Sequence, residues 1–441
     1  MRRLLTCLLC LAAALTAAAQ FRPSYRSLSD SETVTAFREQ VGFLASAALE
    51  GRKAGSEGEQ EAAAYVTDVL GAYGLDILSG ADGDLFGLKQ ESGDTLTSRN
   101  VVACIPGYDK TLREHYIVIG ARLDNLGSVR YSVDGESRER IYYGANGNAS
   151  GLSMLLELSR MLSAGSVLLK RSVIVAAFGA SLESGAGAWY FLNRSFGGGQ
   201  AAIDAMIDLD MVGTGSGGFY AYTSSNPDLN RLLEQVNATL QPVKPELVSL
   251  EPVASDHRIF YDREIPSVLF TTGMYPEYNT ERDTPSILEY DEMERELEYL
   301  YNFTLALANG PKPDFREDSA AAQADNADVV SFYDCDVRPS FFRSRDPSSF
   351  LERWVYVYLR YPQSAVDEGV QGRVLVDFVI DEKGKVTDVK VAKGVDPRLD
   401  AEAVRVVSAS PDWKPGVLRG KKVKTALSLY IEFRLEKKKK R

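Results

Sequence analysis

The sequence predicts an α/β protein with a mostly parallel sheet flanked by helices, followed by a small α+β domain. Runs of β-branched and apolar residues at 116–121, 172–179, 205–213 and 266–272 alternate with helical patterns such as 150–165. Apolar strands that alternate with helices are typical of parallel sheets covered on both faces. A change of composition near residue 310 predicts that a second domain follows.

The first 19 residues have the features of a secretory signal peptide. Arg2 and Arg3 precede an apolar run over 4–15, and small residues lead to a cleavage site expected before Gln20. The run is shorter than the roughly 20 residues that a spanning helix needs. We expect the protein to be exported and residues 1–19 to be removed. We expect no transmembrane helix after cleavage, because no later segment is long and apolar enough.

The charge balance and the cysteines limit the partners. The net charge of −11 argues against nucleic acid as a partner. The basic tail at 437–441 is expected to be solvated or to touch an anionic surface. Signal cleavage leaves Cys104 and Cys335, and the sequence leaves open whether they bond.

The large domain is expected over residues 29–309. Its first helix begins with a capping-box pair of Ser29 and Glu32. Four apolar residues then recur at helical spacing: Val34, Phe37, Val41 and Leu44. A second helix is expected over 59–74. In sheets of this kind function gathers at the carboxyl ends of the strands, where the polar clusters of this sequence fall.

A linker is expected over 310–332 and a small domain over 333–436. The linker contains Pro, Ala and Asp without an apolar period. The small domain follows a compact pattern: a helix at 348–360, strands at 372–380 and 385–394, a helix at 400–410 and a closing strand at 424–435.

Eight ordered motifs give the large domain a family resemblance. They run from VGFLASAALEGRKAGSEGEQEAAAYV at 41–66 to YNTERDT at 278–284, and include IGARLDNLG, GANGNASG, IDLDMVG and SDHRIF. In order and spacing the motifs resemble the di-zinc aminopeptidase family, which also contains glutaminyl cyclases and the non-catalytic ectodomain of the transferrin receptor. The resemblance covers residues 32–309 and implies a zinc-aminopeptidase-like fold.

The metal site implied by this resemblance has lost several of its residues. Arg122 stands where active relatives have a histidine ligand, and a guanidinium has no lone pair for a metal. Gly147 takes the place of the bridging aspartate, and Leu182 the place of the general base. Asn279 replaces a histidine that helps to hold the reacting carbonyl. We therefore expect no intact set of catalytic residues.

Three ligand positions keep their residues according to the resemblance: Glu183, Asp210 and His257. In the family Asp210 serves one metal, while Glu183 and His257 serve the other. A catalytic zinc takes three protein ligands and leaves one position for water, so a reduced single-metal site remains an alternative. The main expectation is that no cofactor is bound.

Arg122 leads to a structural prediction. Without two divalent ions, Asp124, Glu183 and Asp210 would face one another as like charges. We predict that Arg122 pairs with at least one of these carboxylates, so that a salt-bridged cluster replaces the metal centre.

The other positions of the implied pocket are Asp124, Asn146, Tyr278 and Asn279. We expect this pocket either to accept a peptide or protein amino terminus or to remain as part of a folded scaffold without a ligand.

The small domain resembles the carboxyl-terminal domain of the TonB energy transducer family over residues 345–436. Tyr361-Pro362, Gly369 and the run from Trp413 to Gly416 stand where that pattern puts them. The resemblance implies a Gram-negative periplasmic or secreted protein that docks by β-augmentation. The partner would be an outer-membrane receptor segment, the cell wall or a second copy, and residues 424–435 are the expected edge strand.

Two interpretations follow. The first is an exported, metal-free pseudo-peptidase that binds peptides or serves as a scaffold and docks through its TonB-type domain. The alternative is an active metallo-aminopeptidase or glutaminyl cyclase-like hydrolase with a single metal.

Overall fold

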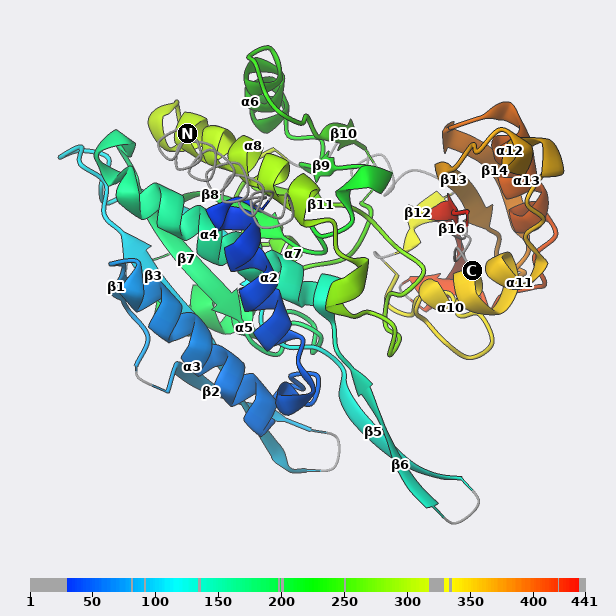
Figure 1. Cartoon of the computed structure of the whole chain (residues 1–441), viewed down its shortest axis with the longest axis horizontal. Helices are drawn as coiled ribbons and strands as arrows, with labels where there is room; N and C mark the ends of the chain where they lie inside the picture. Colours follow the sequence, from blue (N-terminus) through cyan, green and yellow to red (C-terminus); the bar gives the residue numbers. More distant parts are fainter. Residues whose placement is uncertain are drawn as a thin grey trace, which may run out of the picture.

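The computed structural model describes residues 30–435, except for 81, 91–92, 134–135, 197–198, 200–201, 250, 317–328, 333–334 and 419. The expected signal peptide, the middle of the expected linker and the basic tail therefore lie outside the described residues. Among the helices that are described, none is both long and apolar enough to cross a membrane. The chain forms a large α/β domain with a small α+β domain beside it (Figure 1).

A nine-stranded mixed sheet runs through the large domain in the order β1-β3-β7-β4-β8-β11-β9-β10, with β2 paired to β3. The strands are β1 Asp76–Ile77, β2 Asp84–Lys89, β3 Thr95–Ile105, β4 Tyr116–Arg122, β7 Ser172–Phe178, β8 Ile203–Leu209, β9 Tyr220–Tyr222, β10 Glu246–Val248 and β11 Ser267–Thr271. The four central strands, β7, β4, β8 and β11, are parallel, as predicted. On either side of these four, the pairing with β3 and with β9 is antiparallel.

Helices cover both faces of this sheet (Figure 1). Their bounds are α2 Glu32–Leu44, α3 Glu57–Ala72, α4 Ser150–Ala164, α5 Ala186–Tyr190, α6 Pro227–Asn237, α7 His257–Tyr261 and α8 Tyr290–Asn309. Ile117 and Ile119 point into the core shared with α2, α3, α4, α6 and α8. Val118 points to the opposite core, under α5 and α7. The strands are therefore apolar on both faces, which explains their unbroken hydrophobic runs.

The N-terminal cap of the first helix lies two residues later in the chain than expected. Ser31, not Ser29, caps α2, because its side chain accepts a hydrogen bond of 3.0 Å from the Val34 amide. Ser29 lies outside the described residues. The four apolar positions predicted for this helix are all buried, as expected.

A two-stranded hairpin extends from the large domain (Figure 1). It consists of β5 Gly127–Val133 and β6 Glu136–Tyr142, which pair in antiparallel register. The sequence analysis did not predict it, although Asp134-Gly135 is a typical hairpin turn sequence.

The small domain contains a sheet in the order β12-β16-β13-β14, with β15 also paired to β16. Its elements are β12 Val329–Ser331, α10 Ser348–Phe350, α11 Tyr356–Tyr358, α12 Gln363–Asp367, β13 Gly372–Ile380, β14 Val386–Lys393, α13 Pro397–Ser408, β15 Gly416–Leu418 and β16 Lys421–Phe433. The helix expected at 348–360 is interrupted by a wide turn over Leu351–Val355. Trp413 is 4% exposed and belongs to the core.

The expected docking edge at 424–435 is covered in part, so β16 is not the last strand of the sheet. β16 pairs with β13 on one side, and β12 covers Lys424–Ala426 on the other. The physical reason is that the short strand β12 pairs in parallel with this part of β16. β14 forms the opposite end of the sheet.

Arg373, in β13, anchors the small domain on the large one. Its side chain is 5% exposed, and Nη1 donates a hydrogen bond of 2.8 Å to the carbonyl oxygen of Thr272. A Cβ at Gly217 would collide with this guanidinium, so the glycine makes room for it. The rings of Tyr220 and Tyr430 pack beside it with centroids 4.8 Å apart.

We predict that Arg373→Met weakens the association of the two domains. Loss of a buried hydrogen bond from a charged donor should lower the free energy of unfolding by about 2 kcal/mol, measured by urea denaturation. Arg398→Met is the matched control, because Arg398 forms ion pairs on the surface of the same domain. An equal effect of both substitutions would show that Arg373 is not an anchor.

Candidate functional site

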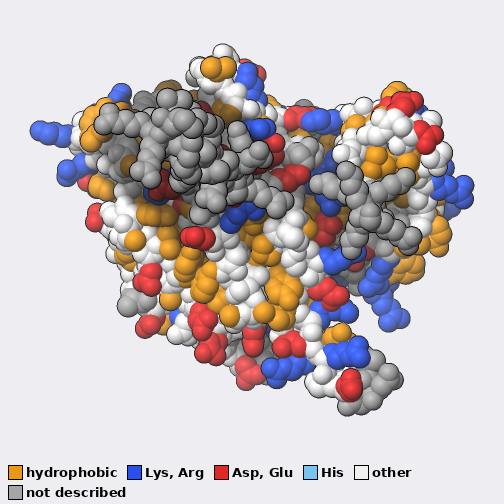
Figure 2. Space-filling view, viewed as in Figure 1, with side chains coloured by type: hydrophobic (Ala, Val, Ile, Leu, Met, Phe, Trp, Pro, Cys, Tyr) orange, Lys and Arg blue, Asp and Glu red, His pale blue; other side chains and the backbone are white. Residues whose placement is uncertain are grey.

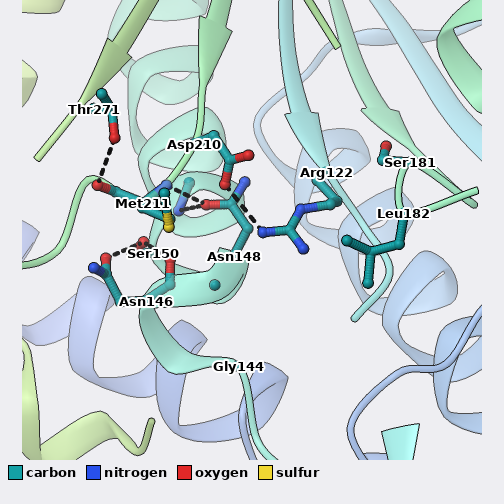
Figure 3. A network of polar contacts seen from close by, with 12 residues as sticks. Arg122, Gly144, Asn146, Asn148, Ser150, Ser181, Leu182, Asp210, Met211 and Thr271 are labelled. Atoms are coloured by element: carbon teal, nitrogen blue, oxygen red, sulfur yellow. Dashed lines mark hydrogen bonds and ion pairs between the residues drawn. The ribbon is translucent and has the colours of Figure 1, made fainter. Parts of the chain in front are cut away.

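The candidate site lies at the carboxyl ends of the central parallel strands (Figure 3). Arg122 is the last residue of β4, and Asp210 follows β8 directly. Leu182 and Glu183 lie in the loop after β7, and His257 begins α7. The topology therefore brings these segments to one edge of the sheet, as the sequence predicted.

Arg122 and Asp210 form a buried ion pair. Arg122 Nη2 lies 3.1 Å from Asp210 Oδ1, and both side chains are 4% exposed (Figure 3). Burial opposes the charge of Arg122, but the carboxylates of Asp210 and Asp124 raise its pKa above the ordinary value. The predicted pairing of Arg122 with a carboxylate of the old site is confirmed, and a permanent cation lies beside Asp210.

The three residues expected to survive as ligands do not meet. Asp210 is paired with Arg122. Glu183 is exposed to solvent, in contrast to the buried Asp210 and His257. Leu182, at the position of the missing base, is 40% exposed. Leu182 and Glu183, in the loop after β7, are thus exposed to solvent, whereas the ion pair is buried.

His257 lies between two carboxylates. Its Nδ1 is 3.2 Å from Asp208 Oδ2, and its Nε2 is 2.9 Å from Glu251 Oε1. Burial alone would lower the pKa of His257, but contacts with Asp208 and Glu251 raise it to about 9. An imidazolium donates from both nitrogens and has no lone pair for a metal.

Glu251 was missed by the sequence analysis, because it belongs to no motif and reaches His257 only through the fold. Burial would raise the pKa of this carboxyl, but Arg258 and His257 lower it to about 2. The Arg258 Nε donates to both Glu251 oxygens at 2.7 and 2.8 Å. Glu251 is therefore a carboxylate held by two cations.

Two further aspartates complete the buried cluster. Asp124 accepts hydrogen bonds from the amides of Ser181 at 2.7 Å and Leu182 at 3.3 Å. Burial raises the pKa of Asp124 to about 6, against the lowering effect of Arg122 and these amides. Asp256 accepts a hydrogen bond of 2.6 Å from the Ser181 hydroxyl, and burial together with Asp208 raises its pKa. Both oxygens of Asp124 are thus used within the protein, whereas Asp256 Oδ1 is buried and has no hydrogen-bond partner among the described residues.

The space for a bridging aspartate at position 147 is taken by two tyrosines. A Cβ at Gly147 would lie 3.1 Å from the Tyr275 hydroxyl and 3.7 Å from Tyr278 Cε2. Tyr275 donates a 2.6 Å hydrogen bond to Asp283, which also accepts from the amides of Asn146 and Gly147. Tyr275 and Asp283 were missed by the sequence analysis, although Asp283 lies in the last quoted motif. A longer side chain at position 147 would have to displace this arrangement.

Polar side chains hold the loop before α4 against the end of β8 (Figure 3). Asn148 Oδ1 accepts from the amides of Met211 and Gly151, and its Nδ2 donates to the Leu209 carbonyl. Asn146 Oδ1 accepts a 2.7 Å hydrogen bond from the Gly213 amide. Asn146, expected to line a pocket, therefore has a structural role.

The small domain contacts the loop that carries the last expected pocket residues. Asn279 Nδ2 donates a 2.8 Å hydrogen bond to Asp346 of the small domain. Burial raises the pKa of the neighbouring Tyr278, and the Asp346 charge raises it further. The small domain thus packs on the same side of the molecule as the old site.

These residues do not fit a zinc centre. The first expected ligand, Asp210, faces a guanidinium, His257 lies between the carboxylates of Asp208 and Glu251, and Glu183 is exposed. Among the residues whose positions are described, no group of three or more His, Cys, Asp or Glu side chains could hold a metal ion. Cys104 and Cys335 are not bonded to each other and lie in different domains.

We predict that Arg122→Met destabilises the protein by about 3–5 kcal/mol at neutral pH, because it leaves Asp210 buried and unpaired. Loss of Arg122 raises the pKa of Asp210 further, so the deficit should shrink as the pH falls and Asp210 becomes neutral. Urea denaturation at several pH values measures this. The double variant Arg122→Met/Asp210→Leu should recover most of the loss, and strictly additive effects would contradict the pairing.

We also predict that His257 remains protonated at pH 7.5. Because its pKa is about 9 in the folded protein against 6.5 ordinarily, its stabilising effect is complete below pH 6.5 and is lost as the pH rises through 9. The effect is on the order of 3 kcal/mol. NMR titration of the imidazole measures the pKa directly, and His115→Gln identifies the signal because the chain has 2 histidines. A ring that titrates near 6.5 would contradict this account.

Solved structures similar to this chain include an aminopeptidase from Aneurinibacillus sp. strain AM-1, which is 18% identical, covers 64% of this chain and 96% of its own, and gives a TM-score of 0.49. The zinc aminopeptidase BSAP from Bacillus subtilis is 14% identical, with 65% and 98% coverage and a TM-score of 0.49. A glutaminyl cyclase from Bacteroides thetaiotaomicron is 17% identical, with 63% and 98% coverage and a TM-score of 0.49.

Comparison of the sequence with protein families finds a match in each domain. Protein TonB of Pseudomonas aeruginosa is 33% identical over 78 residues, which are 18% of this chain and 23% of that protein. The chain thus spans about a quarter of the length of this curated relative. Residues 100–304 match peptidase family M28, and residues 357–435 match the C-terminal domain of the Gram-negative bacterial TonB protein. The large domain thus contains a match to peptidase family M28, and the small domain contains a match to the TonB C-terminal domain.

Proposed function

We propose that this chain is an exported, catalytically inactive M28 protein of the Gram-negative envelope. Its large domain acts as a scaffold, and its TonB-type domain docks to another envelope component. The partner is an outer-membrane receptor segment, the cell wall or a second copy of the chain.

The observation that carries the proposal is the buried ion pair of Arg122 and Asp210. The guanidinium lies 3.1 Å from the carboxylate that would serve a metal, and it stays charged at any physiological pH. Leu182 offers no basic group at the position of the general base. Loss of a positioned base typically lowers a rate about 100-fold to 10,000-fold, even with a metal in place.

The same ion pair favours a scaffold over a peptide-binding cleft. An amino terminus needs an accessible carboxylate, but Asp210 is 4% exposed and already paired. Asp124 is 1% exposed and accepts two backbone amides. Asn279 is bound to Asp346 of the small domain. Apart from the exposed Glu183, the expected pocket groups that could recognise a peptide terminus are therefore used inside the protein.

Docking is assigned to the small domain, because strand addition needs a sheet edge and little side-chain chemistry. β14 lies at the end of the small sheet and is 8 residues long. Lys390 and Lys393 lie on this strand, and lysines discourage unspecific edge pairing. The edge at 427–433 of β16 is the second candidate, because β12 covers only Lys424–Ala426.

We predict that the purified chain retains well under one zinc ion after incubation with zinc and dialysis. We also predict that it does not hydrolyse an aminoacyl p-nitroanilide. Metal content by mass spectrometry and absorbance at the nitroaniline band measure the two outcomes. His257→Ala and the matched control His115→Ala should behave alike in metal content.

The competing single-metal hydrolase makes the opposite prediction. A zinc content near one per chain that is lost in His257→Ala but kept in His115→Ala would refute the metal-free proposal. Hydrolysis that disappears in the same variant would establish the hydrolase instead.

A further inference from the structure

A basic hollow lies on the small domain, away from the buried cluster of the large one. Its volume is about 650 Å³, and five cationic side chains line it: Arg338, Arg343, Arg345, Lys414 and Lys422. No carboxylate is among the lining residues. Lys and Arg side chains gather along the lower and outer margin of the small domain in Figure 2.

The backbone around the hollow is held by paired hydrogen bonds. Val337 and Val417 exchange two main-chain bonds of 3.0 and 2.8 Å, and Ser340 and Lys414 exchange two of 3.0 and 2.9 Å. Beyond Ser340 the chain turns back on itself through two bonds between Phe341 and Ser344. The segments that carry the arginines and lysines are therefore positioned before any ligand arrives, which reduces the entropy lost on binding.

The charges of four of these five side chains are not neutralised by an ion pair among the described residues. Over the described part of the chain, Arg343, Arg345, Lys414 and Lys422 take part in no ion pair, whereas most arginines of the small sheet and α13 do. Like charges gathered in one concavity repel one another unless an anion joins them. This gathering also stands out in a chain whose net charge is −11.

We propose that the basic hollow binds a ligand with at least two phosphate groups. Guanidinium groups match the geometry of phosphate oxygens and donate two parallel hydrogen bonds, and lysines add point charges. The four cations without an ion pair, Arg343, Arg345, Lys414 and Lys422, exceed what a single carboxylate or monophosphate would neutralise. The same chemistry is offered by a phospholipid surface and by a soluble polyphosphate, so the experiment separates these sources.

The test uses inorganic tripolyphosphate as a soluble probe, by isothermal titration calorimetry of the purified chain at low salt. Arg345→Gln/Lys422→Gln should weaken binding at least about 10-fold, or about 1.4 kcal/mol. The matched control is Lys383→Gln/Lys385→Gln in the β13–β14 turn, which changes the charge equally and should alter the affinity less than about 2-fold. The basic tail is unchanged in both variants, so it cannot account for a difference between them.

A second arm measures co-sedimentation with vesicles of phosphatidylglycerol, using phosphatidylcholine vesicles as the blank. Binding to phosphatidylglycerol that falls in the hollow variant but not in the control identifies a lipid surface as the source. Tripolyphosphate binding alone identifies a soluble ligand. The proposal is overturned if neither probe binds, if both variants lose binding equally, or if polyglutamate binds as tightly as tripolyphosphate.

Discussion

A buried positive charge next to Asp210 is the constraint on which the large domain depends. The carboxyl ends of four parallel strands bring several aspartates together, and a cluster of this kind needs cations to fold. Arg122 supplies one at 3.1 Å, and His257, whose pKa is raised to about 9 by Asp208 and Glu251, is expected to supply another. Asp124 stays in the cluster because its pKa is raised to about 6. Side-chain charges thus balance a site that divalent metals would balance in a di-zinc enzyme.

This balance of charges is separate from the packing that holds the large domain together. The core of the sheet is apolar on both faces and does not depend on a metal. The small domain then packs beside the rearranged pocket through Arg373 and through Asn279, whose amide reaches Asp346. The loop after β11, which would face a substrate in an open cleft, instead contacts the small domain. The small domain is therefore attached on the same side of the large domain as the buried Arg122–Asp210 ion pair.

Much of the fold was predictable because strands buried on both faces have continuous apolar runs in the sequence, as at 172–179. The order of the motifs along the chain also indicated a known family. The pairing of Arg122 was predictable from charge once the family resemblance had placed it among carboxylates. The exposure of Glu183 was not, since the loop after β7 is oriented by hydrogen bonds from Ser181 and Leu182 that have no sequence signal. Glu251 was missed for the same reason. β12 was missed because three residues that follow a polar linker carry no strand pattern, yet they add to β16.

The two binding features proposed for the small domain solve different physical problems. Strand addition at β14 or at the remaining edge of β16 uses main-chain hydrogen bonds, which any extended peptide can provide. Such bonds give affinity but little discrimination, so specificity has to come from side chains outside the ladder. The basic hollow meets this need, because Arg343, Arg345 and Lys422 recognise charge and geometry rather than backbone. A docking domain with both features would distinguish a peptide presented at a phosphate-rich surface from the same peptide free in solution.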